Sequence, residues 1–347
     1  MQRLLLRHRA DLVGLVIVIL IAVFVPNSFG AGWLSTFTTC AVVAMPAAGI
    51  GLLYGELGLT SLTQFAFVGI GGWVALRLGI GYGWPMPALI AAAAVVTALF
   101  GTLLSIPALR LRDLYLALVT LLVAASVNIA LNATGFPNGG KGFLGYQAVG
   151  KLERLQRPGF AKDDPAYFRL VIIHVAAVFV FFALVKRSKI GRAWALTAQS
   201  EGAARSAGVR VTRLKVLAFA MAAGVSGIAG ALMAGQLKQL APATFQPANS
   251  ILLFALVVIG GARSPFGWVI GALLYRAAPY LLDQWGVSGD IATMIFGVAV
   301  IHNLLSAPGG LAEQFKGLGG LLRGLVGKLR PPAAATIGSP QPAEVES

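Results

Sequence analysis

Long apolar segments alternate with short polar ones along most of the chain. A helix needs about 20 mostly apolar residues to cross a bilayer. Segments that approach this length cover residues 12–26, 34–54, 62–78, 86–106, 112–132, 167–185, 214–236, 249–262, 266–283 and 290–306. The first, eighth and tenth are short, so one of them could be a partial or tilted span. The pattern predicts an all-α, polytopic integral membrane bundle of about ten transmembrane helices.

The composition agrees with this pattern. Hydrophobic residues make up 57% of the chain and charged residues 11%, whereas soluble domains average about 25% charged residues. A net charge of +15 could indicate nucleic-acid binding, but the basic residues lie mostly between apolar spans with few aromatic residues among them. We therefore attribute the charge to topological signalling and to contact with membrane lipid. The single cysteine, Cys40, leaves no disulfide or Cys-based metal site within the chain.

The Lys and Arg residues also indicate the orientation, because they gather in short cytoplasmic loops. Most of the 27 Lys and Arg residues fall inside when both termini are cytoplasmic. Residues 1–310 then form the transmembrane domain, with a cytoplasmic loop at 186–215 and an external loop at 133–166. Residues 311–330 have the Leu and Lys/Arg spacing of an amphipathic segment on the inner leaflet. Residues 331–347, rich in Pro and Ala, are expected to be a disordered tail.

Catalytic patterns are not visible in the sequence. We find no His/Glu zinc motif, no paired intramembrane aspartates and no Ser–His pair on adjacent turns. Gly135, Gly140 and Lys141 have the spacing of a phosphate-binding loop, but Gly142 stands where Ser or Thr would hold magnesium. We therefore expect neither an enzyme nor a cofactor or metal site.

The cytoplasmic loop is the most distinctive polar stretch. It holds eight Lys or Arg residues against one acid, Glu201. Residues 193–207 have high helix propensity, broken by Gly202, and Gly208 suits a left-handed conformation at the end of the helix. Glu201 and Arg205 have the i,i+4 spacing of an ion pair worth ~0.2–0.5 kcal/mol. The alternative is a solvated loop that obeys the charge rule and binds nothing.

The pattern Glu201-x-Ala203-Ala204-x3-Gly208 resembles the EAA---G signature of ABC importer permeases. The flanking residues, 188–193 and 208–215, and the small-residue stretch at 222–232 are similar to the LivM-type permeases of branched-chain amino acid importers. The resemblance implies a short coupling helix that docks into a groove on an ATPase subunit, where small alanines allow close approach and the acid offers a charge partner. The residues it assigns to this coupling are Glu201, Ala203, Ala204, Arg205 and Gly208.

Other stretches resemble the same family in the same order, at residues 109–121, 250–261 and 308–311. The resemblance covers about residues 40–310. One departure lies at 51–73, where Gln64 and the glycines are kept but Thr63 replaces a glycine. This region lies near the pathway in the family, so the departure bears on the substrate more than on the fold.

The resemblance implies a multi-pass permease subunit in the inner (plasma) membrane of a bacterium. Its expected partners are a homologous second permease subunit, two cytoplasmic ABC ATPase subunits and an extracytoplasmic solute-binding protein. The expected function is import of branched-chain amino acids with energy from the separate ATPases. One alternative is the same class of permease for urea or short-chain amides, and another is an ion-coupled secondary transporter.

Polar residues inside the predicted spans are candidates for the translocation path. We select Gln64, Thr120, Asn128, Asn132 and Asn249. The alternative for each is a hydrogen bond that links helices within the bundle.

Overall fold

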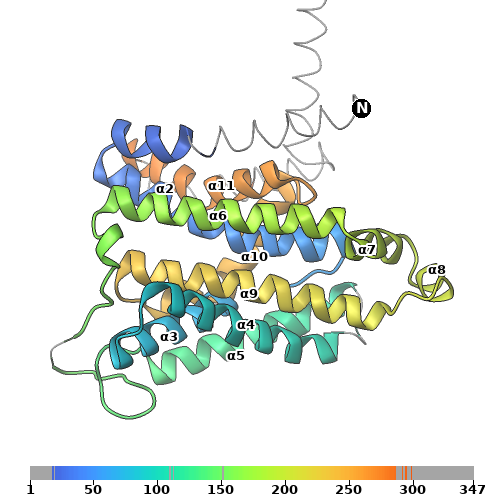
Figure 1. The fold of residues 1–347 in the computed structure, drawn as a ribbon, viewed down its shortest axis with the longest axis horizontal. Helices are drawn as coiled ribbons and strands as arrows, with labels where there is room; N and C mark the ends of the chain where they lie inside the picture. The colour runs from blue at the N-terminus through green and yellow to red at the C-terminus, as the bar shows by residue number, and fades with distance from the viewer. Residues whose placement is uncertain are drawn as a thin grey trace, which may run out of the picture.

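The computed structural model describes residues 20–108, 113–150 and 152–286, together with residues 18, 111, 291, 294 and 298. In these ranges every regular element is helical, as predicted (Figure 1). The α-helices are α2 (Ala31–Ile50), α3 (Gln64–Tyr82), α4 (Met86–Ala108), α5 (Asp113–Thr134), α6 (Asp164–Arg187), α7 (Lys189–Gln199), α8 (Glu201–Ser206), α9 (Val211–Leu237), α10 (Pro247–Gly260) and α11 (Pro265–Gln284). A π-helix, η1 (Gly51–Glu56), extends α2, and two short 3₁₀ helices are η2 (Gly159–Ala161) and η3 (Pro242–Phe245).

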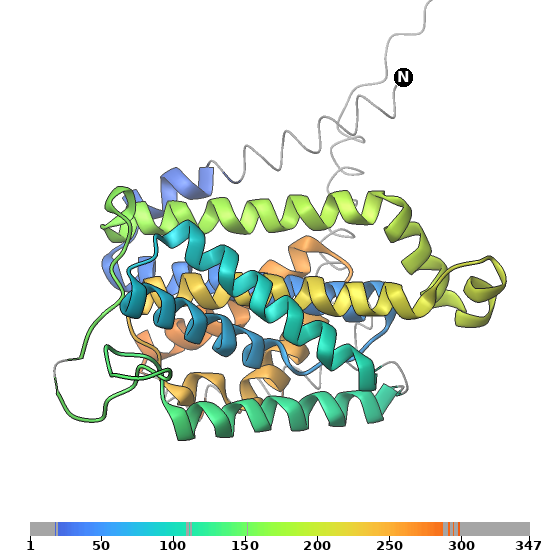
Figure 2. The same cartoon turned by 60° about the horizontal axis from the view of Figure 1, so that its bottom comes forward.

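The long helices lie roughly along one axis, and the two ends of the bundle differ (Figure 1). The end that carries α7 and α8 projects beyond the other helices, and we call it the α8 end. The opposite end carries the long connection between α5 and α6, residues 135–163, and we call it the loop end. Figure 2 shows the same division after a 60° turn. Residues 186–215 and 133–166, predicted to lie on opposite sides of the membrane, are therefore at opposite ends of the bundle.

Six of the described helices are long and apolar enough to cross a membrane, namely Ala31–Glu56, Gln64–Tyr82, Met86–Ile106, Leu114–Thr134, Asp164–Arg187 and Val211–Leu237. They correspond to the second to seventh predicted spans. The eighth is α10, with only 14 residues, and the ninth is α11, which contains Arg276 and Asp283 and lies outside this group.

The remaining terminal predictions fall mostly outside the described residues. Residues 20–28 are helical, so the helix covers the end of the first predicted span, 12–26, and continues two residues beyond it. The tenth predicted span and residues 311–347 lie largely or wholly outside the described part. Ten spans and two cytoplasmic termini therefore stay predictions.

Small residues allow α9 to pack directly on α3. A Cβ atom built on Gly230 would lie 2.1 Å from the carbonyl oxygen of Val68, and one built on Gly71 would lie 2.5 Å from the carbonyl oxygen of Gly227. Both neighbours are backbone atoms, so no side-chain rotation can make room. In lipid, where water does not drive helices together, such close packing is a main source of association. Glycines on both helices therefore make this direct backbone contact possible.

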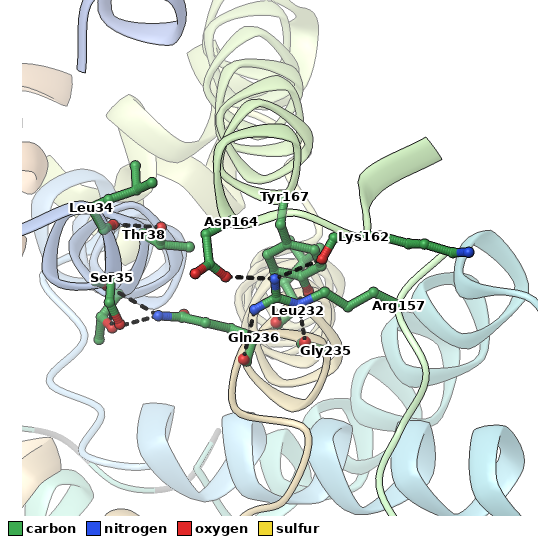
Figure 3. Close-up of polar contacts among 11 residues, drawn as sticks. Leu34, Ser35, Thr38, Arg157, Lys162, Asp164, Tyr167, Leu232, Gly235 and Gln236 are labelled. Atoms are coloured by element: carbon green, nitrogen blue, oxygen red, sulfur yellow. Dashed lines mark hydrogen bonds and ion pairs between the residues drawn. The ribbon is translucent and has the colours of Figure 1, made fainter. Parts of the chain in front are cut away.

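The guanidinium group of Arg157 connects several elements at the loop end (Figure 3). The side chain of Arg157 donates from Nε to the carbonyl oxygen of Gly235 at 3.0 Å and from Nη2 to that of Gln236 at 3.0 Å. These carbonyls belong to the last turn of α9, the negative end of the helix dipole. Arg157 Nη1 also pairs with the Asp164 carboxylate at 2.6 Å, and its guanidinium lies over the Tyr167 ring. The connection is thereby bound to the adjacent ends of α6 and α9.

Three further hydrogen bonds complete this cluster, and two of them include α2 (Figure 3). The Tyr167 hydroxyl donates to the carbonyl oxygen of Leu232 at 2.6 Å, which joins α6 to α9. The Gln236 amide donates to the carbonyl oxygen of Ser35 at 3.0 Å and to Thr39 Oγ1 at 2.9 Å, which joins α9 to α2. At the loop end, hydrogen bonds therefore join α2, α6 and α9 to one another.

The close contact of α9 with α3 predicts a sharp difference between two glycines of one helix. Gly230→Ala should lower the melting temperature of the detergent-purified protein, because overpacking typically costs about 1–3 kcal/mol. Gly224→Ala is the control, since its Cβ would meet no atom closer than 3.3 Å. Equal melting temperatures for the two variants would contradict the direct backbone contact.

Candidate functional site

The α8 end is built from two short helices that connect α6 to α9 (Figure 1). Ser188 begins α7, and its Oγ accepts a hydrogen bond from the Ile190 amide at 3.1 Å. Ser200 begins α8, and its Oγ accepts from the Ala203 amide at 3.3 Å. The prediction of a run broken at Gly202 is wrong. The break lies at Ser200, whose extended backbone turns the chain while its hydroxyl caps the next helix.

Gly208 ends α8 in the left-handed conformation that the sequence predicts, with φ of 78°. The Gly208 amide donates to the carbonyl oxygen of Arg205 at 3.0 Å, and the Val209 amide donates to that of Ala204 at 2.9 Å. This pair of bonds is the Schellman closure of a helix end. A Cβ on Gly208 would meet nothing within 4 Å, so glycine is needed there for its backbone conformation and not for space.

Glu201 is partly buried and is held by two basic side chains. Its carboxylate pairs with Arg205 Nη2 at 3.3 Å, as the i,i+4 spacing predicts, and also with Nζ of Lys215 on α9. The Lys215 side chain is only 7% exposed, whereas that of Arg205 is 65% exposed. The Glu201–Lys215 pair thus contributes most of the anchoring, because a partly buried pair is screened less than an exposed one. The sequence prediction that this acid faces a partner protein did not foresee its internal partner.

Lys215 was not predicted to be a site residue, although the sequence around it indicates a buried cation. Val211, Lys215, Ala218 and Ala222 recur at helical spacing and are all buried. A single Lys among small apolar residues on one helix face indicates a buried cation that needs an acid. The acid lies 14 residues earlier in the chain, on a separate helix, so local spacing rules could not identify it.

The remaining signature residues divide between two faces of α8. Ala204 is fully buried, whereas Ala203, Arg205 and Gly208 are exposed. The exposed surface of α8 and its closure therefore consists of small residues with one arginine. A partner can approach this backbone closely.

The other distinctive region is a break in the helices at membrane depth. After η1, residues 58–63 are not helical, and α3 begins at Gln64. Two amides near this break bond to hydroxyls of other helices, Leu62 N to Thr120 Oγ1 at 3.1 Å and Phe65 N to Ser250 Oγ at 3.2 Å. Thr120 lies about 10 Å along α5 from the start of that helix, at 1.5 Å per residue. Hydroxyls here replace the water that lipid cannot supply.

Six uncharged polar side chains gather at this break, and we call them the polar cluster: Ser61, Thr63, Gln64, Thr120, Ser226 and Ser250. Each is no more than 2% exposed. Ser61 and Thr63 share a hydrogen bond of 2.9 Å, and the Ser226 hydroxyl donates to Gln64 Oε1 at 2.6 Å. Within the described residues, Gln64 Nε2 has no hydrogen-bond partner. The cluster therefore offers a buried donor in addition to the positive end of α3.

The structure separates the five predicted path residues into two groups. Gln64 and Thr120 belong to the polar cluster. Asn128 donates to the carbonyl oxygen of Pro242 at 3.0 Å, Asn249 donates to that of Thr244 at 2.9 Å, and Asn132 donates to Asn128. These three asparagines fix the η3 connection and its neighbours instead.

Comparisons with known proteins agree on one family. The model of the family described as "Branched-chain amino acid transport system / permease component" matches residues 31–304. The chain is 29% identical to the "High-affinity branched-chain amino acid transport system permease protein LivM" of Salmonella typhimurium and to that of Escherichia coli, over 86% of this chain and 74% of each relative.

A third relative comes from Methanocaldococcus jannaschii. It is a "Probable branched-chain amino acid transport permease protein LivM", 21% identical over 82% of this chain and 87% of the relative. No solved structure matches the chain. The matched region includes both the polar cluster and α8. The chain is therefore a multi-pass membrane protein of the family of permease components of branched-chain amino acid transport systems, which are transport proteins and not enzymes.

Proposed function

We propose that this chain is the transmembrane permease subunit of an ABC importer that moves branched-chain amino acids into the cytoplasm. The observation that supports this most directly is α8, a short helix with a small-residue surface that projects from the bundle and is anchored to α9 by Glu201 and Lys215. Separate ATPase subunits bind this surface, and ATP-driven closure of the ATPase pair moves it. The α8 end is cytoplasmic, consistent with the eight Lys or Arg residues of residues 186–215.

The division of α8 into two faces suits this role. Ala203 and the exposed residues near Gly208 contact the ATPase groove, and Arg205 presents a cation to it. Glu201 and Ala204 face the other way and keep the helix fixed on α9. Force applied at the exposed face then reaches a long transmembrane helix instead of bending a flexible loop.

The same proposal assigns the complex. This chain pairs with a homologous second permease subunit in the inner membrane of a bacterium. Two cytoplasmic ABC ATPases bind the α8 ends, and an extracytoplasmic solute-binding protein delivers the substrate at the loop ends. Membership in the family supports assembly into an ABC transport complex.

The polar cluster is the part of the path that this chain supplies. The N-termini of α3 and α10 converge there, since Ser250 lies in the first turn of α10 and bonds to Phe65 of α3. Interrupted helices that point their positive ends at one place favour a carboxylate. Gln64 Nε2 adds a donor. An amino acid supplies a carboxylate with a compensating ammonium, which suits a cluster of polar groups that carry no net charge.

The uncharged character of the cluster also separates this proposal from a proton-coupled carrier. Proton relays inside membranes use chains of Asp, Glu or His. The six side chains of the polar cluster include none of these. Nucleotide hydrolysis in separate subunits supplies the energy instead.

Cross-linking tests the proposed function. A photo-cross-linking amino acid at Ala207, which is exposed beside Gly208, should trap an ATP-binding subunit in intact membranes. The same probe at Phe143, which is 81% exposed at the loop end, should not. Leucine uptake by the same cells should stop on ATP depletion. Failure to trap an ATP-binding protein at Ala207, or uptake that survives depletion, would refute the proposal.

The Glu201–Lys215 anchor generates a prediction about coupling. Lys215→Met leaves Glu201 without its buried partner, and breaking a buried pair costs about 3–5 kcal/mol. We expect leucine uptake to fall at least about tenfold, with the amount of protein in the membrane unchanged. The double variant Glu201→Gln/Lys215→Met should recover part of the loss, because it leaves no unpaired buried charge and Arg205 is exposed to solvent.

Arg213→Met is the matched control for Lys215→Met. Arg213 is an exposed basic residue in the first turn of α9, two residues before Lys215. Removal of its charge should therefore change leucine uptake little. A Lys215→Met variant with wild-type uptake would show that the anchor does not serve coupling.

Gln64 Nε2 has no hydrogen-bond partner within the described residues, so we predict that loss of this amide impairs substrate recognition. Gln64→Leu keeps the side-chain size but removes the amide, and a hydrogen bond to a charged group is worth about 1.5–3 kcal/mol. The KM for leucine uptake should therefore rise by about tenfold or more, while the melting temperature stays near the wild-type value. Thr97→Val is the control, since Thr97 is a buried hydroxyl on α4 that bonds to its own helix at 2.6 Å. An unchanged KM in Gln64→Leu would remove Gln64 from the path.

A further inference from the structure

An ion pair at the α8 end links α6 to the π-helix that precedes the break. Glu56, the last residue of η1, pairs with Nζ of Lys186 at 2.6 Å. The two side chains are 21% and 23% exposed. Lys186 lies in the last turn of α6, two residues before Ser188, which begins α7. The pair therefore joins the start of the α7–α8 projection to the end of the interrupted span.

Lys186 is held on its other sides by the turn between α10 and α11. Its Nζ donates to the carbonyl oxygen of Arg263 at 3.3 Å and lies 5.2 Å from the centre of the Trp268 ring. Trp268 is buried and donates from Nε1 to the carbonyl oxygen of Ala262 at 2.6 Å. The ammonium is thus held between this region and Glu56, so a displacement of Lys186 would change its contact with the Glu56 carboxylate.

The backbone of η1 packs closely on the same turn. Arg263 Nε donates to the carbonyl oxygen of Gly55 at 3.3 Å. A Cβ atom on Gly55 would lie 2.6 Å from the carbonyl oxygen of Ala262. Glycine at this position permits a contact between two backbones, so η1 and the turn move together.

The backbone next to Glu56 has features that allow a change of conformation. A π-helical turn carries one extra residue in the helical ladder and recurs at functional sites. The following residues, 58–63, are not helical, and hydroxyls of Thr120 and Ser250 satisfy nearby amides. Side-chain hydroxyls can exchange one amide for another at small cost, whereas a continuous helix would have to break its own ladder.

Two polar contacts of α7 and α8 lead to a different kind of element. Trp194 of α7 donates to the carbonyl oxygen of Leu214, and Lys215 holds Glu201, so these contacts end on α9. That helix is continuous over 27 residues and packs against α3 through glycines. The Glu56–Lys186 pair, in contrast, ends on η1, beside the break.

We propose that Glu56 and Lys186 are positioning residues that transmit movement of the α7–α8 projection to residues 58–63 and so open and close the polar cluster. This inference rests on the proposed function, because it requires an ATPase that moves α8. When Lys186 shifts with the end of α6, it displaces Glu56 and η1. The hydroxyl bonds of the break then rearrange around Gln64.

The test uses the complex isolated through a tag on this chain and reconstituted in liposomes, with ATP and radiolabelled leucine as the probes. Glu56→Gln and Lys186→Gln should leave the ATPase rate within about twofold of wild type and lower the leucine imported per ATP by about tenfold. The swap Glu56→Lys/Lys186→Glu should restore the ratio to within about threefold of wild type, because it rebuilds the pair with reversed charges.

Arg169→Gln is the matched control, because it removes an exposed charge near the opposite end of the same helix, α6. Its leucine-to-ATP ratio should equal that of the wild-type complex. The inference is overturned if Glu56→Gln and Lys186→Gln keep the wild-type ratio, or if the swap does not recover it. A wild-type complex without ATP-dependent leucine uptake would instead sink the proposed function, and the inference with it.

Discussion

The absence of water inside a bilayer is the constraint on which the rest of this structure depends. An amide left without an acceptor in lipid costs several kcal/mol, so a chain can leave the helix at membrane depth only where other groups accept its hydrogen bonds. Between η1 and α3 the chain does so, and Thr120 and Ser250 provide the acceptors. The same requirement that permits the break also gathers hydroxyls at it. A polar cluster inside the bundle follows from the backbone before any substrate is considered.

The α8 end depends on a related rule for charge. A buried ammonium such as that of Lys215 is costly unless an acid faces it, and Glu201 is that acid. The pair fixes a helix of only six residues, which could not be stable by itself because short helices are marginal in water. The signature acid therefore stabilises the shape of the surface that we propose binds the ATPase. Its neighbours Ala203 and Arg205 are exposed on that surface.

The sequence predicted those features that depend on local order. Apolar length located the six described spans, and the requirement for positive φ located the end of α8 at Gly208. Features that depend on contacts between distant residues were not predicted. Ser250 Oγ accepts a hydrogen bond from the Phe65 amide, 185 residues away in the sequence. Nothing in the sequence around Ser250 distinguishes it from other serines in helices. The break at Ser200 was missed because helix propensity gave more weight to Gly202, whereas capping by a serine hydroxyl determines where α8 begins.

The two ends of α6 and α9 together explain why a small push at α8 can act at depth. At the loop end, Arg157 and Tyr167 join the helices through backbone carbonyls of α9, which cannot rotate away. In the proposed function, a load at the α8 end would therefore tilt α6 and α9 about this fastened end, because the hydrogen bonds there oppose sliding. Tilting displaces atoms in proportion to their distance from the fixed point, and α6 is about 36 Å long at 1.5 Å per residue over 24 residues. Lys186 lies at the far end of that length, where a given tilt moves it most.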